Sequence, residues 1–192
     1  MYKSKRRKNG NNWRFLLKTN KKLPLFIITG ASGVGKSTTC EMLFQNETEY
    51  IIMESDLLWH DVYNTPNDNY RKYRELWLRV CANISQIGKP VVLCGCVTPE
   101  QFDVCIEKDL FTEIYYLAII CDDDILENRI RIGRKINDEN WIKGSIEFNR
   151  WFKDNGKDQN IHLLSTTGLL PEQAAKEIDK WIRDKMIKIV NF

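Results

Sequence analysis

Short apolar runs alternate with amphipathic segments along this chain from residue 23 onward. Five of the runs have the length of a β-strand, at residues 25–29, 50–54, 90–94, 114–120 and 161–164. The run at 90–94 is apolar throughout, which is typical of a parallel strand that is buried on both faces. The alternation of such runs with helical segments predicts an α/β fold, in which helices cover both sides of a parallel sheet.

Helical spacing of apolar residues marks the segments between these runs. The predicted helices lie at residues 36–44, 57–63, 70–87, 99–110, 122–131, 138–152 and 171–187, and residues 64–69 form a turn around Pro66. Gly88 would end the longest helix, and the acidic start and basic end of 122–131 agree with the helix macrodipole. With 192 residues and no internal repeat, the chain is expected to form one domain, a three-layer sandwich around a five-stranded parallel sheet.

The six cysteines and two histidines provide no metal or redox motif. No CxxC pair occurs, and Cys94-Gly95-Cys96 alone leaves a zinc site short of ligands. No apolar run reaches the roughly 20 residues of a membrane span, and no signal-type apolar segment follows the basic N-terminus. We therefore expect a reduced, soluble, cytoplasmic protein without membrane association.

The net charge of +3 is unevenly distributed. Residues 1–22 hold nine basic side chains and no acidic one, whereas residues 23–192 hold 20 basic and 26 acidic side chains. We therefore divide the chain into a basic N-terminal extension, residues 1–22, and a domain, residues 23–192. The extension could bind nucleic-acid phosphates. A disordered, solubilising segment is the interpretation that we favour, because the extension has no element that fits a groove.

The most specific motif follows the first predicted strand. Gly30-Ala31-Ser32-Gly33-Val34-Gly35-Lys36-Ser37 fits GxxxxGKS between a strand and a helix, which is typical of a phosphate-binding loop. In such a loop Lys36 reaches the β- and γ-phosphates, Ser37 binds magnesium and Thr38 contacts the α-phosphate. A chance glycine turn would not combine these identities, this spacing and these flanking elements. The predicted nucleotide-binding residues of the motif are Gly30, Ser32, Gly33, Val34, Gly35, Lys36, Ser37 and Thr38.

Nucleotide binding alone leaves a kinase, a hydrolase switch and a motor ATPase open. A GTPase would need a guanine-reading NKxD segment late in the chain, and the sequence has none. A motor ATPase would usually end its third strand with a carboxylate, whereas residues 91–96 contain none. Glu54-Ser55-Asp56 instead ends the second predicted strand, at the sheet edge where open α/β folds bind their ligands.

GASGVGKST, a second strand that ends in ExD, an arginine-bearing segment after the fourth strand and the chain length together resemble the small P-loop kinases of the nucleoside monophosphate kinase-like group. This group includes shikimate and gluconate kinases, chloramphenicol phosphotransferase and predicted nucleoside kinases. The resemblance covers about residues 24–185, and only the phosphate loop is specific as a motif. It implies a P-loop NTPase fold with strand order 2-3-1-4-5, a small lid at about residues 129–152, and phosphoryl transfer from ATP with Mg²⁺ to a small-molecule acceptor.

The resemblance also implies roles for the two carboxylates. Asp56 takes the position of the carboxylate that holds the acceptor hydroxyl, and we expect it to be catalytic together with Lys36. Glu54 takes the position of a magnesium-binding carboxylate, with Ser37 as the second metal residue, although related kinases carry Asp there. The alternative for Asp56 is an N-cap of the helix predicted at 57–63.

Arginines after the fourth strand form another predicted part of the site. Related kinases supply lid arginines that neutralise the transferred phosphoryl group, and Arg129 and Arg134 are our catalytic candidates. Arg131 must face another way than Arg129, two residues before it, and Arg150 is a weaker candidate. The resemblance also implies that Arg129 and the loop at 165–168, with Thr167, flank the adenine. The alternative is that these arginines are solvated residues at a helix end.

We expect the acceptor to bind between the second strand and the longest helix, where aromatic rings and a few polar groups suit a flat ring. The predicted substrate-binding residues are Asp56, Trp59, Tyr63, Arg74 and Gly95. Tyr73 and Trp77 lie on the apolar stripe of the helix and are better explained as core. A nucleoside or nucleotide is the acceptor that we favour, and a sugar acid, a shikimate-like ring or an antibiotic is the nearest alternative. A nucleotide-gated nucleic-acid-binding protein is the alternative of a different class. The sequence predicts no oligomeric state.

Overall fold

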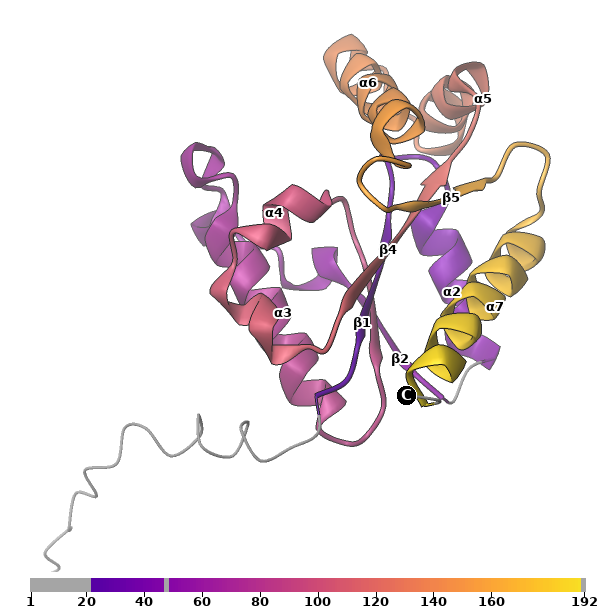
Figure 1. Cartoon of the computed structure of the whole chain (residues 1–192). Coiled ribbons are helices and arrows are strands. Elements are labelled where there is room, and N and C mark those ends of the chain that lie inside the picture. Colours follow the sequence, from indigo (N-terminus) through magenta and orange to yellow (C-terminus); the bar gives the residue numbers. More distant parts are fainter. Residues whose placement is uncertain (1–21, 47–48, 191–192) are drawn as a thin grey trace, which may run out of the picture.

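The computed structural model of this protein describes residues 22–46 and 49–190. Five parallel strands form one sheet in the order β2-β3-β1-β4-β5 (Figure 1). The strands are β1 (Leu25–Thr29), β2 (Ile51–Glu54), β3 (Val91–Cys94), β4 (Ile114–Ile120) and β5 (His162–Ser165). The predicted strand number, direction and order are confirmed. The basic extension predicted at residues 1–22 lies outside the described residues, apart from Lys22.

The helices cover both faces of the sheet (Figure 1). They are α2 (Lys36–Asn46), α3 (Arg71–Ser85), α4 (Pro99–Asp103), α5 (Asp123–Asn128), α6 (Glu139–Asn155) and α7 (Pro171–Val190). Helices α2 and α7 pack on one face, and α3 and α4 pack on the other. The three-layer sandwich is therefore confirmed. No helix within the two described ranges is long and apolar enough to cross a membrane.

The central strand β1 shows why helices cover both faces of the sheet. Its side chains alternate between the two faces, as they do in any β-strand. Phe26 and Ile28 belong to the core formed with α2 and α7, whereas Leu25 and Ile27 belong to the core formed with α3. All four are fully buried. A strand that is apolar at its first four positions is therefore fixed in the middle of the sheet, and its carboxyl end leads directly into the phosphate loop.

The prediction of a helix at residues 57–63 is wrong. Two short 3₁₀ turns replace it, η1 (Ser55–Leu58) and η2 (Asp61–Tyr63), and a third, η3 (Pro66–Asp68), follows. His60 between the first two is extended, and its Nδ1 accepts a hydrogen bond from the N–H of Val62 at 3.2 Å. This local bond competes with helix continuation, as short polar side-chain bonds to the backbone do.

Two other predicted helices are interrupted. The segment 99–110 divides into α4, which starts with a capping box between Thr98 and Gln101, and a 3₁₀ turn, η4 (Ile106–Leu110). The carboxylate of Glu75 on α3 accepts hydrogen bonds from the first two N–H groups of η4 and so fixes its start. The helix predicted at 122–131 ends as α5 and continues as one π-helical turn, η5 (Arg129–Gly133). Asp138 then caps the start of α6.

Candidate active site

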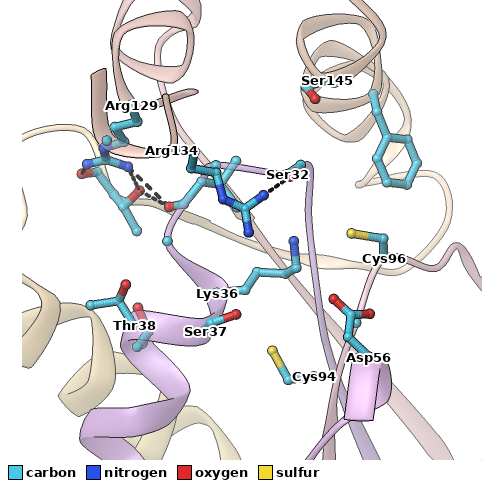
Figure 2. Close-up of a pocket in the computed structure, with 18 of the residues that line it drawn as sticks. Ser32, Lys36, Ser37, Thr38, Asp56, Cys94, Cys96, Arg129, Arg134 and Ser145 are labelled. Carbon is cyan, nitrogen blue, oxygen red and sulfur yellow. Dashed lines mark hydrogen bonds between the residues drawn. The ribbon is translucent and has the colours of Figure 1, made fainter. Parts of the chain in front are cut away.

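A cavity of about 990 Å³ lies at the carboxyl ends of β1, β2 and β3. Its wall is formed by residues 32–39 of the phosphate loop and α2, by residues 94–96 after β3, and by one face of α6. The lining also includes Glu54 at the end of β2, Asp56 after it, Arg129 and Arg134 after α5, and Thr166 after β5. The carboxyl edge of the sheet is the place where open α/β folds bind ligands. The cavity is therefore the candidate site, and Figure 2 shows its interior.

The phosphate loop holds its lysine over the cavity. Nζ of Lys36 donates hydrogen bonds of 2.8 Å to the carbonyl oxygens of both Gly30 and Ala31. Gly33 has a φ of +91°, and a Cβ at this position would lie 2.7 Å from Cγ1 of Ile130, so no other residue fits there. In Figure 2, Lys36 points into the cavity, between Arg134 on one side and Asp56 and Cys96 on the other. The loop thus has the geometry that a phosphate site needs.

The residues predicted to bind magnesium reach the same cavity from two elements. Ser37 is exposed in the first turn of α2, and Glu54 ends β2. A hydroxyl and a carboxylate are hard oxygen donors, which suit Mg²⁺. No group of three or more His, Cys, Asp or Glu side chains in the described part of the chain could hold a metal ion. These two residues therefore fit a magnesium ion that takes its other ligands from phosphate and water.

Asp56 lies on the cavity side of η1 and is exposed. Its Oδ1 accepts a hydrogen bond of 3.2 Å from the hydroxyl of Ser55. Glu54, not Asp56, occupies the position before the first turn, and no side chain caps that turn. The N-cap alternative for Asp56 is therefore wrong, and its carboxylate is directed to the cavity without a structural task there (Figure 2).

The candidate arginines reach different parts of the phosphate loop. Arg129 donates from Nη1 to the carbonyl oxygen of Val34 and to Oγ1 of Thr166, both at 3.1 Å, and from Nη2 to the carbonyl oxygen of Thr166 at 3.2 Å. Arg134 donates to the hydroxyl of Ser32 (Figure 2). Arg131 binds Glu127 and Glu139 instead, as its spacing from Arg129 predicts.

The loop after β5 connects Arg129 to the sheet, because Thr166 in this loop accepts hydrogen bonds from Arg129. Thr166 in this loop is buried, and Thr167 accepts a 2.9 Å hydrogen bond from the N–H of Asp122 with its Oγ1. Thr166 lines the cavity, whereas Thr167 and Gly30 are not among the lining residues. The sequence pointed to this loop through Thr167, whereas the threonine that faces the cavity is Thr166.

Helix α6 forms a wall that the sequence reasoning missed. Trp141, Gly144, Ser145 and Phe148 have i, i+3, i+4 and i+7 spacing, and all four line the cavity. The buried side chain of Asn149 fixes this helix, because it accepts a bond from the N–H of Cys121 at 3.3 Å and donates to the carbonyl oxygen of the same residue at 2.8 Å. The spacing was visible in the sequence, but it does not say which face meets a cavity.

Two cysteines and a glycine line the cavity after β3. Cys96 is exposed, and its thiol lies 3.3 Å from the carbonyl oxygen of Gly30. Cys94 is buried, and a hydrogen bond with Cys40 together with burial raises the pKa of its thiol well above the usual value. A Cβ on Gly95 would lie 2.5 Å from Oγ of Ser55, so Gly95 permits the close packing of the segments after β2 and β3.

The other predicted acceptor residues do not line the cavity. Trp59 packs edge-on against Tyr73 with ring centres 5.2 Å apart, and Tyr63 lies 5.6 Å from the same ring. Tyr73 and Trp77 both donate to the carbonyl oxygen of Ser55. Trp77 is only 1% exposed, which agrees with its interpretation as core. This aromatic cluster attaches the segment after β2 to α3.

Arg74 is buried in α3, with its guanidinium 5.7 Å from the centre of the Tyr70 ring. Its Nη1 has no hydrogen-bond partner among the described residues. Burial lowers the pKa of this guanidinium, although it stays charged at neutral pH. Arg74 therefore lies behind the aromatic cluster and not on the cavity wall.

No family model and no curated protein matches the sequence of this chain. Solved structures match its fold over most of its length. Shikimate kinase from Acinetobacter baumannii, in complex with shikimate, gives a TM-score of 0.60 at 14% identity and covers 88% of this chain and 98% of that one. The tunicamycin resistance protein from Deinococcus radiodurans gives 0.57 at 15% identity, with coverage of 84% and 96%.

A gluconokinase from Sinorhizobium meliloti is a third similar structure. It gives a TM-score of 0.53 at 14% identity and covers 82% of this chain and 90% of its own. At identities this low the likeness establishes the fold alone. The chain has the P-loop kinase fold, with the strand order that the sequence predicted.

Proposed function

We propose that this protein transfers the γ-phosphoryl group of ATP, with Mg²⁺, to a hydroxyl group of a small molecule. The observation that carries the proposal is the shared cavity of Lys36 and Asp56, which come from the loop after β1 and from the turn after β2. A phosphate-binding lysine and a free carboxylate in one cavity are the two groups that phosphoryl transfer to a hydroxyl needs.

The reaction assigns one role to each of these residues. The acceptor oxygen forms a bond to the γ-phosphorus, the bond from that phosphorus to the bridging oxygen breaks, and ADP leaves. Asp56 orients the hydroxyl and accepts its proton. Lys36 stays with the β- and γ-phosphates and stabilises the charge that shifts to the leaving oxygen.

Mg²⁺ and the arginines after α5 would supply the remaining positive charge near the phosphates. Ser37 and Glu54 would hold Mg²⁺, which would supply positive charge to the phosphates when it is bound. Arg134 is within reach of the phosphates, since it already donates to Ser32 in the phosphate loop. Arg129 positions the loop through Val34, and with Thr166 and Thr167 it would border the adenine.

Nucleosides and nucleotides are the first acceptors to examine. Sugar acids, shikimate-like rings and antibiotics follow, because similar structures carry the names shikimate kinase, gluconokinase and tunicamycin resistance protein. Asp56 and Gly95 border the space where any of these would bind. Trp59, Tyr63 and Arg74 do not line that space and are not part of the proposal.

The test is ATP consumption with magnesium across this panel, compared with the rate without acceptor. Strong stimulation by one class supports the proposal and identifies the acceptor chemistry. ATP binding without stimulation by any acceptor counts against it. A nucleotide-gated nucleic-acid-binding protein then becomes the better description, and deletion of residues 1–22 should abolish its salt-dependent binding to RNA or DNA.

A further inference from the structure

We infer that the acceptor is an uncharged hydroxyl compound with an apolar or aromatic face, and that phosphate- and carboxylate-bearing compounds are poor acceptors. The inference rests on the proposed function and narrows it to one charge class. It comes from the distribution of charge around the cavity, which is strongly uneven.

The cations that line the cavity do not extend to its acceptor side: Arg129 and Arg134 lie on one side, and Lys36 lies in the middle (Figure 2). No other lysine or arginine is among the lining residues, all of which lie in the described ranges. Lys36 donates to the phosphate loop itself, Arg129 to Val34 and Thr166, and Arg134 to Ser32. Each of them is therefore placed for the nucleotide and not for a second anion.

The opposite side of the cavity carries acids and neutral groups. Figure 2 shows Asp56, Cys96 and Ser145 on the far side of Lys36 from Arg129. Glu54 also lines the cavity but would hold Mg²⁺, so Asp56 is the carboxylate that faces an incoming acceptor. An anionic substituent here would be repelled by Asp56 and would lose water without gaining a cationic partner, which is unfavourable.

Helix α6 contributes only uncharged residues to this side. Trp141, Gly144, Ser145 and Phe148 line the cavity, and Trp141 is 52% exposed. The basic residues of α6 lie on other faces and have acidic partners there: Lys143 with Glu147 at 3.8 Å, and Arg150 and Lys153 with Asp123 at 2.6 and 3.1 Å. Two aromatic rings beside small residues form a surface for the apolar face of a ligand.

Arg74, the buried cation of α3, does not change the distribution of charge around the cavity. Arg74 is 8% exposed and is not among the residues that line the cavity. Its guanidinium lies over the Tyr70 ring, 5.7 Å from the ring centre. Arg74 is therefore not available to an anion that binds in the cavity.

The experiment measures acceptor binding without turnover. The full chain is saturated with Mg²⁺ and a non-hydrolysable ATP analogue, and Trp fluorescence follows titration with charge-matched pairs: a nucleoside and its 5′-monophosphate, and a sugar alcohol and the sugar acid of the same chain length. Trp141→Phe identifies the signal that comes from the cavity wall. We expect the neutral member to bind at least about tenfold more tightly, a difference of about 1.4 kcal/mol. Tighter binding of the anionic member in each pair would overturn the inference.

A second experiment uses Gly144→Lys, which adds a positive charge to the acceptor side of the cavity. Gly144 is exposed on the cavity face of α6, and a Cβ there would meet nothing within 4 Å, so the variant should fold. We expect it to strengthen binding of the anionic member by about tenfold and to leave the neutral member within about threefold. Asp154→Asn, which also adds one unit of positive charge but at an exposed position of α6 outside the cavity lining, is the control and should do neither. No change in Gly144→Lys would contradict the inference.

These results separate the inference from the proposed function. Binding of the neutral member without any phosphoryl transfer would contradict the kinase proposal and still support the inference. Transfer to an anionic acceptor would support the kinase proposal and overturn the inference.

Discussion

The hydroxyl of Thr166 lies 3.1 Å from the carbonyl oxygen of Val34, 132 positions earlier in the chain, and donates a hydrogen bond to it. Arg129 donates to the same carbonyl oxygen and to the same hydroxyl oxygen. Three segments, the phosphate loop, the turn after α5 and the loop after β5, thus meet at one backbone carbonyl. The shape of the phosphate loop therefore depends on residues far outside its motif.

Thr166→Val should weaken ATP binding more than it slows transfer. Removal of the hydroxyl leaves the Val34 carbonyl with only its bond from Arg129, so the loop is held less firmly. We expect KM for ATP to rise by about five- to tenfold, corresponding to about 1–1.4 kcal/mol, with kcat within about twofold. Steady-state kinetics check this, and Thr112→Val at an exposed position is the control. An unchanged KM would show that the contact does not shape the nucleotide site.

Lys36→Ala should reduce transfer by about 10²–10³-fold, because it removes the charge that stabilises the leaving phosphate oxygen. The measurement is ATP turnover with the best acceptor from the panel. Since Nζ also bonds the carbonyl oxygens of Gly30 and Ala31, a thermal melt must establish that the variant is folded. Lys176→Ala, on the exposed side of α7, should keep full activity. A folded and fully active Lys36→Ala protein would refute the phosphate-loop assignment.

Asp56→Asn should retain ATP binding and lose about 10²–10⁴-fold in kcat, because the amide cannot accept the proton of the acceptor hydroxyl. Binding is measured by titration with ATP, and kcat by ADP release. Asp61→Asn in the next 3₁₀ turn is the matched control, since Asp61 is exposed and does not line the cavity. Equal turnover in both variants would remove Asp56 from the mechanism.

Alkylation of the native protein should begin at Cys96 and block nucleotide binding. Cys96 is exposed beside Gly30, whereas burial raises the pKa of Cys81 to about 12 and that of Cys105 to about 11, so these thiols are protonated and slow to react. Peptide mapping after treatment with a maleimide identifies the modified residue. ATP with magnesium should protect it, and Cys96→Ser should resist inactivation. First reaction at another cysteine, or full ATP binding by the labelled protein, would be the contrary result.

Asp123→Asn should destabilise the protein at neutral pH and much less in acid. Burial raises the pKa of Asp123, but hydrogen bonds from Arg150 and Lys153 outweigh it, so the folded-state pKa lies below the usual 3.8. The carboxylate therefore stabilises the fold above about pH 3.8, and this contribution is lost as the pH falls through the folded-state pKa.

Urea denaturation of wild type and Asp123→Asn between pH 7 and pH 3 measures this difference. The gap between their free energies of unfolding should be largest at pH 7 and should shrink below about pH 4. Asp124→Asn, at the neighbouring exposed position, should show no such gap. A gap that stays constant with pH would mean that the variant acts through packing and not through charge.

Much of the fold was predictable because the strands are continuous apolar runs. The bounds of β1 and β4 agree with the prediction, since polar residues and the phosphate-loop glycine mark their ends. The segment after β2 was not predictable in the same way. Its conformation depends on the bond between His60 and the backbone of Val62, and on Asn69 and Tyr70, which have φ values of +52° and +57°. The spacing of residues 57–70 does not predict that a tyrosine has a left-handed backbone conformation.

The same division applies to the candidate site. The phosphate loop was predicted from its motif, and Asp56 and Arg134 from the resemblance to small P-loop kinases, and the structure brings these residues into one cavity wall. Trp141 and Phe148 were missed, because helical spacing cannot tell a face that meets a cavity from one that meets a core. Trp59 and Tyr63 were selected for their rings, and in the structure those rings pack on Tyr73. Tertiary contacts decide these cases.

Asn149 forms two hydrogen bonds with the backbone of Cys121, and these affect how the site opens. They hold the middle of α6 against the end of β4, and the ion pairs of Asp123 reinforce them. Of the predicted lid, residues 134–138 lie between η5 and α6, outside the helix that this anchor holds. Under the proposed function, α6 gives the acceptor a wall that is already in place without a ligand, so neither substrate has to bind first. Shape and charge would select the acceptor at first encounter, without a closing motion of the helix.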